Sequence, residues 1–376
     1  MDTALRNLGV AALFFVVVLL VGKNVGPYNQ SQIAVALIIF IGVLSINILT
    51  GLSGQLSLGQ GALMAIGGYS CALMINNWHL SMWIAIPLSL VSAAIAGYLL
   101  GLVAARLSGP YLAGTTLLLA LALPTIANRF ETVFGGETGL SIDFGTPTQW
   151  LSGIVSQDSF ELWQLFVALI FATVSLFLTC NLFTSRSARS WRALRDHEPA
   201  AELMGINISR TKTQIFAISS AFAGVAGALY GLRGLVGPSV FGIALSLSLL
   251  TGSILGGLRS ILGAGIGAVI VVFLPDWIGK AMHPFALTDQ LTNYLPALLS
   301  SLLLVLTIVI NPGGIASSLY ALARRARGNF KKKPRLGKVK KELSAIPSST
   351  DPLSDTLNST SGAPSPFQMA VPQWAI

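Results

Sequence analysis

The chain has 376 residues, of which 53% are hydrophobic and 10% are charged, and its mean hydropathy is +0.73. Soluble domains carry about 25% charged residues, so the composition excludes an ordinary soluble protein and predicts an all-α, polytopic membrane protein. The net charge of +9 does not indicate nucleic acid, because ten of the 23 basic residues lie between Arg324 and Lys341, soon after the last apolar run. We expect that basic segment to meet anionic lipid headgroups.

Ten runs are apolar enough to cross a membrane as helices of about 20 residues. In chain order they are residues 8–23, 32–49, 55–75, 82–106, 111–128, 162–184, 213–232, 243–258, 261–275 and 294–311. The third, fifth and ninth are short or rich in glycine, so we expect eight to ten spans. The first run favours a retained anchor over a signal peptide, since no small-residue cleavage site follows it.

The basic residues predict the orientation of these spans. If both termini are cytoplasmic, 19 Lys and Arg lie on the inner side and four on the outer side, which is what the positive-inside rule selects. The segment 130–161 then lies outside, with five acids and no Lys or Arg. We expect a transmembrane domain over residues 1–318. A basic tail rich in Ser, Pro and Thr follows over 319–376 and is expected to be disordered.

The sequence contains little that predicts chemistry. The acids and histidines fall at the ends of the apolar runs or in loops, which disfavours proton-coupled transport through buried relays, whereas sodium held by backbone carbonyls stays open. It has no GxxxxGK[ST] phosphate loop, no Cys or His cluster with metal-ligand spacing and no GxSxG turn. Cys71 and Cys180 are expected to be free thiols. We therefore expect no enzymatic activity and no bound cofactor, which leaves a passive pore or the membrane half of a machine powered elsewhere.

The loop 185–212 is the main concentration of charge between apolar runs, with six basic residues and three acids. Its middle predicts one short amphipathic helix that ends at Gly205. The apolar face of that helix is expected to consist of Ala193, Leu194, Ala200, Ala201, Leu203 and Met204. Two spanning helices would present that helix at the membrane surface, where it is suited to contact a soluble partner. An ordinary solvated loop is the alternative.

The segment 50–68, TGLSGQLSLGQGALMAIGG, interleaves glycines with Ser and Gln. Such glycines permit close helix packing or local unwinding, and unwound carbonyls can hold a zwitterion without a charged side chain. Both interpretations stay open for this segment. The candidates for lining a pathway are Gly51, Ser53, Gly54, Ser57, Gly59 and Gln60. In residues 223–231 and 252–267, the small-xxx-small spacing favours packing.

Four segments and a final NPGGI, in order over residues 32–315, resemble the branched-chain amino acid ABC transporter permeases (Liv type, LivM-like branch). The segments are GLSGQLSLGQGALMAIGGYSCALM, RLSGPYLAGTTLLLALALPTIANRFETVFGGETGLSI, RALRDHEPAAELMGINISRTKTQIFAISSAFAGVAGALYG and LGGLRSILGAGIGAVIVVFLP. Two positions depart from the family pattern. Gln60 stands where many members have His, and Pro199 where the coupling loop of ABC permeases has Glu.

The resemblance implies an ABC importer permease architecture with several partners. Two ATPase subunits bind ATP and dock on the loop 185–212, a second homologous permease completes the pathway, and an extracytoplasmic solute-binding protein delivers the solute. The residues implied for ATPase coupling are Leu194, Arg195, Asp196, Glu198, Ala200, Ala201 and Gly205.

We therefore expect a permease subunit in a bacterial plasma membrane that imports branched-chain or other hydrophobic amino acids. Urea or short amides are alternative solutes for this importer type. From a different class, an autonomous channel or facilitator, or a structural scaffold, is the alternative.

Overall fold

The computed structural model describes residues 2–107, 109–142 and 160–282, together with short pieces between 298 and 315. All the helices below belong to one compact unit, Met1–Leu322. The expected tenth span lies largely outside the described residues. The expected boundary at 318 and the basic tail lie entirely outside them.

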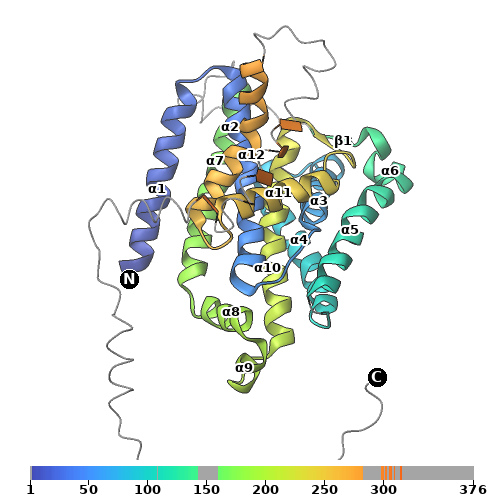
Figure 1. Cartoon of the computed structure of the whole chain (residues 1–376). Coiled ribbons are helices and arrows are strands. Elements are labelled where there is room, and N and C mark those ends of the chain that lie inside the picture. The colour runs from blue at the N-terminus through green and yellow to red at the C-terminus, as the bar shows by residue number, and fades with distance from the viewer. Residues whose placement is uncertain are drawn as a thin grey trace, which may run out of the picture. The chain divides into compact units, whose positions relative to one another are not determined.

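The described residues are almost entirely helical, and the elements are labelled in Figure 1. The long helices are α1 (Asp2–Lys23), α2 (Pro27–Ile46), α3 (Gln60–Trp78), α4 (Met82–Ala104), α5 (Pro110–Arg129), α7 (Phe160–Thr184), α10 (Ile208–Tyr230) and α12 (Ile261–Met282). The shorter ones are η1 (Asn47–Leu52, a π-helix), α6 (Glu131–Phe134), η2 (Gly136–Thr138), α8 (Arg186–Asp196), α9 (Glu198–Leu203), η4 (Gly231–Arg233) and α11 (Ile243–Gly256). Two short strands, β1 (Leu140–Ser141) and β2 (Leu235–Val236), pair antiparallel with Leu140 opposite Val236.

Seven helices in the described ranges are long and apolar enough to cross a membrane, which confirms the all-α polytopic fold class. Two of the expected spans differ from their helices. The third was expected to begin at residue 55, but α3 begins at Gln60 after a non-helical stretch and is not among the seven helices. The eighth corresponds to α11, whose 14 residues measure about 21 Å. That length is shorter than a hydrocarbon core of about 30 Å.

Helices α2 and α10 form the centre of the bundle. In their most apolar windows, 89% of the residues of α2–η1 and 72% of those of α10 are buried, against 11% in α1. The sequence of α2 explains its position, because a helix that is hydrophobic on all sides has no face suited to water and packs well on every side.

Glycines allow these central helices to touch backbone to backbone. A Cβ at Gly227 of α10 would overlap the carbonyl oxygen of Met64 in α3, and one at Gly67 would overlap Gly224. A Cβ at Gly97 of α4 would likewise overlap the side chain of Ser220. These contacts confirm the packing interpretation of the small-xxx-small spacing.

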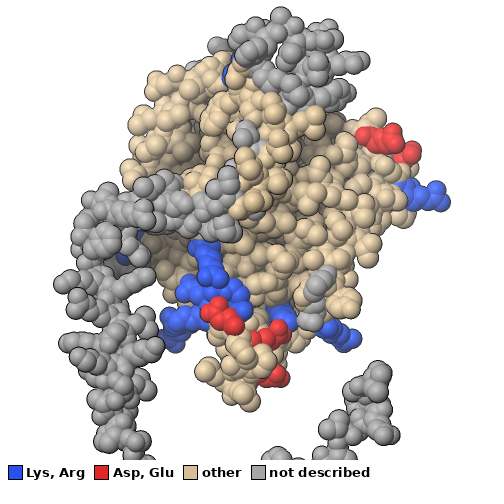
Figure 2. Space-filling model, viewed as in Figure 1, with Lys and Arg blue, Asp and Glu red and all other residues tan. Residues whose placement is uncertain are grey.

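The helix ends define two sides of the bundle. Asn7 Nδ2 donates to Asn181 Oδ1 over 2.9 Å, which joins the start of α1 to the end of α7. Tyr28 Oη donates to Asp276 Oδ1 over 2.8 Å and joins the start of α2 to the last turns of α12. Figure 2 shows Lys, Arg, Asp and Glu gathered over α8 and α9 at the bottom of the view. Charge is therefore concentrated at the end of the bundle where α7 ends and α10 begins.

The last turns of α12 contain ionisable residues, whereas the sequence ended the ninth run at residue 275. The helix continues past Pro275 to Met282, so Asp276 and Lys280 lie within it. They form an i,i+4 ion pair at 2.8 Å, which supports the extra turns.

Candidate functional site

The charged loop folds into two short helices, α8 and α9, which together with the turn that ends α9 we call the α8–α9 hairpin (residues 186–205). Ser185 caps α8, its side chain accepting a hydrogen bond from the backbone N–H of Ala188 at 3.1 Å. Ala188, Trp191 and Leu194 repeat every three residues and form the buried face of α8. The basic residues lie on the remaining surface, so α8 is strongly amphipathic.

The structure corrects the expectation of a single amphipathic helix. His197 is extended and caps α9, with its Nδ1 accepting from the N–H of Ala200 at 3.2 Å. Pro199 lies in the first turn of α9, where its missing N–H is tolerated; inside a continuous helix it would remove a hydrogen bond and clash. The chain therefore breaks after Asp196, and α9 points in a new direction.

Gly205 ends the hairpin, as the sequence predicted. Its φ is +83°, a left-handed conformation that glycine adopts without strain. The N–H of Ile206 donates to the carbonyl of Ala201 at 3.1 Å, and the N–H of Gly205 donates to that of Glu202 at 2.9 Å. These bonds satisfy the last carbonyls of α9 and form a Schellman-type stop.

The seven residues implied for ATPase coupling do not share one surface. Leu194 and Ala201 are buried within this chain, at 4% and 2% exposed, so they support the hairpin from inside. Asp196 and Gly205 are exposed, and Ala200 is half-buried. Arg195 and Glu198 are partly buried and each binds another part of the chain.

Two residues that sequence reasoning assigned to an apolar face are instead the most exposed part of the hairpin. Leu203 is 90% exposed and Met204 is 80% exposed, at the end of α9. Because α9 is separated from α8, its last turn projects away from the bundle (Figure 1). Pro199 was the sequence signal that could have revealed this, because proline favours the first turn of a new helix.

The glycine-rich segment lies where the longest buried helix ends. Helix α2 continues into η1, so one helical stretch covers Pro27–Leu52 and ends in a π-turn. Gly51 faces the carbonyl of Leu258, and Gly59 faces that of Thr116, in both cases without space for a Cβ. These two glycines therefore permit backbone contact.

A buried polar network surrounds the start of α3. Gln60 Nε2 donates to Ser45 Oγ at 2.8 Å and to Ser219 Oγ at 3.0 Å. Ser219 Oγ donates to the Ser45 carbonyl at 2.8 Å, and the N–H of Gly61 donates to Ser246 Oγ at 2.9 Å. Buried polar groups require hydrogen-bond partners. Here the partners lie on different helices, so these hydrogen bonds join α2, α3, α10 and α11.

The pathway candidates are therefore placed mainly inside the chain. Gly51, Ser53, Ser57, Gly59 and Gln60 are buried, and Gly54 is exposed. Ser53 and Gly54 line a cavity of about 240 Å³, together with Gln55, Arg195, Glu198 and Lys212. The structure thus places part of the glycine-rich segment directly against the α8–α9 hairpin, which the sequence treated as a separate site.

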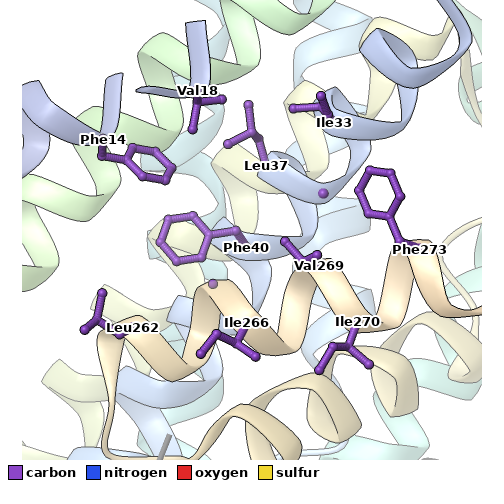
Figure 3. Close-up of a pocket in the computed structure, with 12 residues that line it drawn as sticks. Phe14, Val18, Ile33, Leu37, Phe40, Leu262, Ile266, Val269, Ile270 and Phe273 are labelled. Carbon is purple, nitrogen blue, oxygen red and sulfur yellow. The ribbon is translucent and has the colours of Figure 1, made fainter. Parts of the chain in front are cut away.

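A second cavity, of about 440 Å³, lies between α1, α2 and α12 (Figure 3). Its labelled side chains are all hydrocarbon, including Phe14, Phe40 and Phe273. A zwitterionic solute would find no partner there for its ammonium and carboxylate groups, and unpaired charges are costly in an apolar site. This cavity is therefore unsuited to such a solute.

Comparisons with known proteins place the chain in a family. The family model described as branched-chain amino acid transport system / permease component matches residues 30–310. The chain is 34% identical over 282 residues to the permease protein LivM of Salmonella typhimurium and 33% identical to LivM of Escherichia coli K12, matches covering 69% of this chain. The matched part is 66% of the length of each, so the chain spans slightly less than two thirds of these relatives.

A second group of relatives is more distant. The chain is 26% identical over 276 residues to the permease protein LivH of Escherichia coli K12, covering 70% of this chain and 86% of that protein. No solved structure matches the chain. The family match covers most of the described helices, and the chain belongs to the branched-chain amino acid transport permease family.

Proposed function

We propose that this chain is a permease subunit of an ATP-driven ABC importer for branched-chain or other hydrophobic amino acids. Membership in the permease family supports the transport function, and the names of the relatives suggest the solute class. The proposal assigns ATP binding and hydrolysis to partner subunits, so the chain needs no catalytic site of its own.

The observation that carries the ATP-driven mechanism is the exposed pair Leu203 and Met204. A single exposed apolar residue is ordinary, but here two neighbours at 90% and 80% exposure project from a charged hairpin. Apolar side chains surrounded by charged ones match the pattern of a small protein interface with an apolar centre and a polar rim. The proposed occupant is a groove on an ATPase subunit.

The remaining partners are proposed from the importer type. Two ATPase subunits would bind one hairpin each, a second homologous permease would complete the pathway, and an extracytoplasmic solute-binding protein would deliver solute. The basic segment from Arg324 to Lys341 would contact anionic lipids. We place the protein in a bacterial plasma membrane with both termini cytoplasmic. In support, the start of α1, with Arg6, lies at the same end of the bundle as the hairpin, and among the described residues the main cluster of Lys and Arg lies at that end (Figure 2).

The test is co-purification from mild detergent of the wild-type chain and of the double variant Leu203→Ser/Met204→Ser. We expect the ATPase to co-purify with the wild type and to be lost from the double variant, because apolar anchors at the centre of an interface each contribute about 2 kcal/mol. The matched control is Phe130→Ser, an exposed apolar residue outside the hairpin. It should retain the ATPase.

Other outcomes would redirect the proposal. If no ATPase accompanies the wild type and the chain alone conducts solute in liposomes without ATP, it is a channel or facilitator. If an ATPase accompanies it and the reconstituted complex accumulates urea or short amides in preference to leucine, the mechanism holds and the solute assignment fails.

A further inference from the structure

The Arg195 side chain points into the bundle and is mostly buried against other parts of this chain. It is only 17% exposed, and its Nη1 donates to the carbonyl oxygen of Gly51 at 2.7 Å. Its Nε and Nη2 both donate to Asp196 Oδ1, at 2.9 and 2.7 Å. The guanidinium therefore bridges from α8 to η1, oriented by the carboxylate of the next residue.

The carbonyl that Arg195 binds belongs to the end of a helix. Gly51 lies in the last turn of the 26-residue stretch Pro27–Leu52. The last carbonyls of a helix lack partners within the helix and carry the negative end of its dipole. A guanidinium supplies both a donor and a positive charge, so Arg195 caps this helix from a different element.

The backbone at Gly54 leaves space for the Arg195 side chain. Gly54 has a φ of +75°, and a Cβ there would lie 2.7 Å from Cγ of Arg195. Glycine at this position thus serves two needs, a left-handed backbone and space for the arginine stem. Gly51 and Gly54, predicted to line a pathway, and Arg195, predicted to dock an ATPase, form one structural unit.

A second contact ties the hairpin to the other central helix. Lys212, in the second turn of α10, is 8% exposed and pairs with Glu198 of α9 at 2.5 Å. The hairpin is thus attached to both of the most buried helices, α2–η1 through Arg195 and α10 through Glu198. Ser45 and Ser219, which bind Gln60, lie on those same two helices.

The cavity of about 240 Å³ lies beside these contacts and is lined by residues 53–56. It leaves unfilled space next to the end of η1. A π-turn is an irregular element that often marks a functional position, and here it has room to rearrange.

We propose that Arg195 is a positioning residue that transmits displacement of the α8–α9 hairpin to η1 and α2, and through them to the buried network at Gln60. This inference rests on the proposed function, since an ATPase partner would supply the displacement. Arg195 then acts between the hairpin and the bundle, and Leu203 and Met204 carry the contact with the partner.

The test compares Arg195→Gln with Arg195→Lys in the complete importer, reconstituted in proteoliposomes with its ATPase and solute-binding protein. The readout is leucine taken up per ATP hydrolysed. We expect Arg195→Gln to keep the ATPase bound and hydrolysing while uptake per ATP falls about tenfold, because a hydrogen bond to a charged group is lost. Lysine, which keeps the charge but not the planar fork, should give a smaller loss. The control Arg189→Gln, on the exposed part of the same helix, should match the wild type.

Two further measurements keep the result decisive. Asp196→Asn alters an exposed carboxylate, so folding is not at risk, and it should lower uptake per ATP by a smaller factor than Arg195→Gln. Hydrogen exchange of the amides at residues 50–56 should be faster in Arg195→Gln than in the wild type, in the permease alone.

The outcomes separate this inference from the proposed function. Unchanged uptake per ATP in Arg195→Gln, or unchanged amide exchange, would overturn the transmitting role. Loss of the ATPase from that variant would overturn it too, by making Arg195 a docking residue. If the wild type binds no ATPase, the proposed function fails, whereas the exchange experiment still tests whether Arg195 holds η1.

Discussion

Two regions of the molecule use small and apolar residues in opposite ways. One is the interior of the bundle around α2, α3 and α10, and the other is the α8–α9 hairpin. In the interior, Gly67, Gly224 and Gly227 remove side chains so that backbones touch. In the hairpin, Ala188, Trp191 and Leu194 hold α8 against the bundle, which leaves Leu203 and Met204 free in solvent. The interior is held together by backbone contacts that leave no space for a side chain. The hairpin instead exposes two apolar side chains that contact nothing in this chain's core.

The difference teaches that residue type alone does not mark a functional surface in this protein. The glycine-rich segment was a candidate for lining a pathway because polar side chains accompany its glycines, yet its Thr50, Ser53, Gln55 and Gln60 side chains all donate hydrogen bonds to other groups inside the chain. The hairpin looked like a uniform docking helix, yet only part of it faces outward. Substitutions in the interior should therefore change stability, and substitutions at the hairpin tip should change association.

The largest effect is expected at the crossing of α3 and α10. Gly227→Ala would place a Cβ against the carbonyl of Met64, where backbone rather than a movable side chain is the neighbour. We expect a loss of about 3 kcal/mol in stability, seen as a lower melting temperature in detergent. Gly114→Ala on α5 is the control, because no atom lies within 4 Å of its Cβ position. Equal melting temperatures for the two variants would refute the close-packing account.

A matched pair of arginine substitutions in α9 compares a buried position of the hairpin with an exposed one. Ala201→Arg puts a long charged side chain at a position that is 2% exposed, and it should destabilise the hairpin by about 2 kcal/mol. Leu203→Arg, two residues later and 90% exposed, should leave stability within about 0.5 kcal/mol of the wild type. Limited proteolysis at the hairpin measures both. A hairpin equally resistant in the two variants would show that Ala201 is not buried.

Gln60 tests whether its network is structural or part of a pathway. Gln60→Leu removes the donor to Ser45 and Ser219 and should lower stability by about 1 to 2 kcal/mol. Thermal denaturation of the purified chain measures this loss. If Gln60→Leu instead kept full stability and abolished uptake, the pathway interpretation would be favoured over the structural one.

The smallest expected effect concerns the tie between α9 and α10. Glu198→Gln leaves Lys212 without its ion-pair partner and should cost about 1 kcal/mol, since Glu198 is itself partly in solvent. The control Glu202→Gln changes an exposed carboxylate on the same helix and should cost less. Chemical denaturation of the two variants compares them. A larger loss for Glu202→Gln would contradict the assigned pairing.

Much of the fold could be predicted from the sequence, because long apolar runs specify spanning helices with little ambiguity. The start of α3 and the short length of α11 could not. Both lie at close backbone contacts: Gly59, just before α3, meets Thr116, and Gly256, the last residue of α11, meets Gly263. Such contacts join residues that are far apart along the chain or lie across a turn. The hydropathy of a segment does not predict which other backbone it will touch.

The location of the candidate site was predictable, but the roles of its side chains were not. The concentration of charge at 185–212 and the stop at Gly205 both indicated a displayed helical element. The inward direction of Arg195 depends on the end of η1, more than 140 residues earlier in the chain, to which it is hydrogen-bonded. The exposure of Leu203 depends on the break at His197, which a single amphipathic pattern conceals.

The most direct measurement of the central claim is site-specific crosslinking from Met204→Cys to the ATPase in the assembled complex. The native Cys71 is buried and Cys180 half-buried, so a short crosslinker with one maleimide and one photoreactive group should attach mainly at the new thiol and, on illumination, bond to whatever protein lies against it. We predict a crosslink between this residue and the ATPase, and none from Val133→Cys, an exposed position outside the hairpin. A thiol at position 204 that is readily labelled in the assembled complex but never crosslinks to the ATPase would contradict the account.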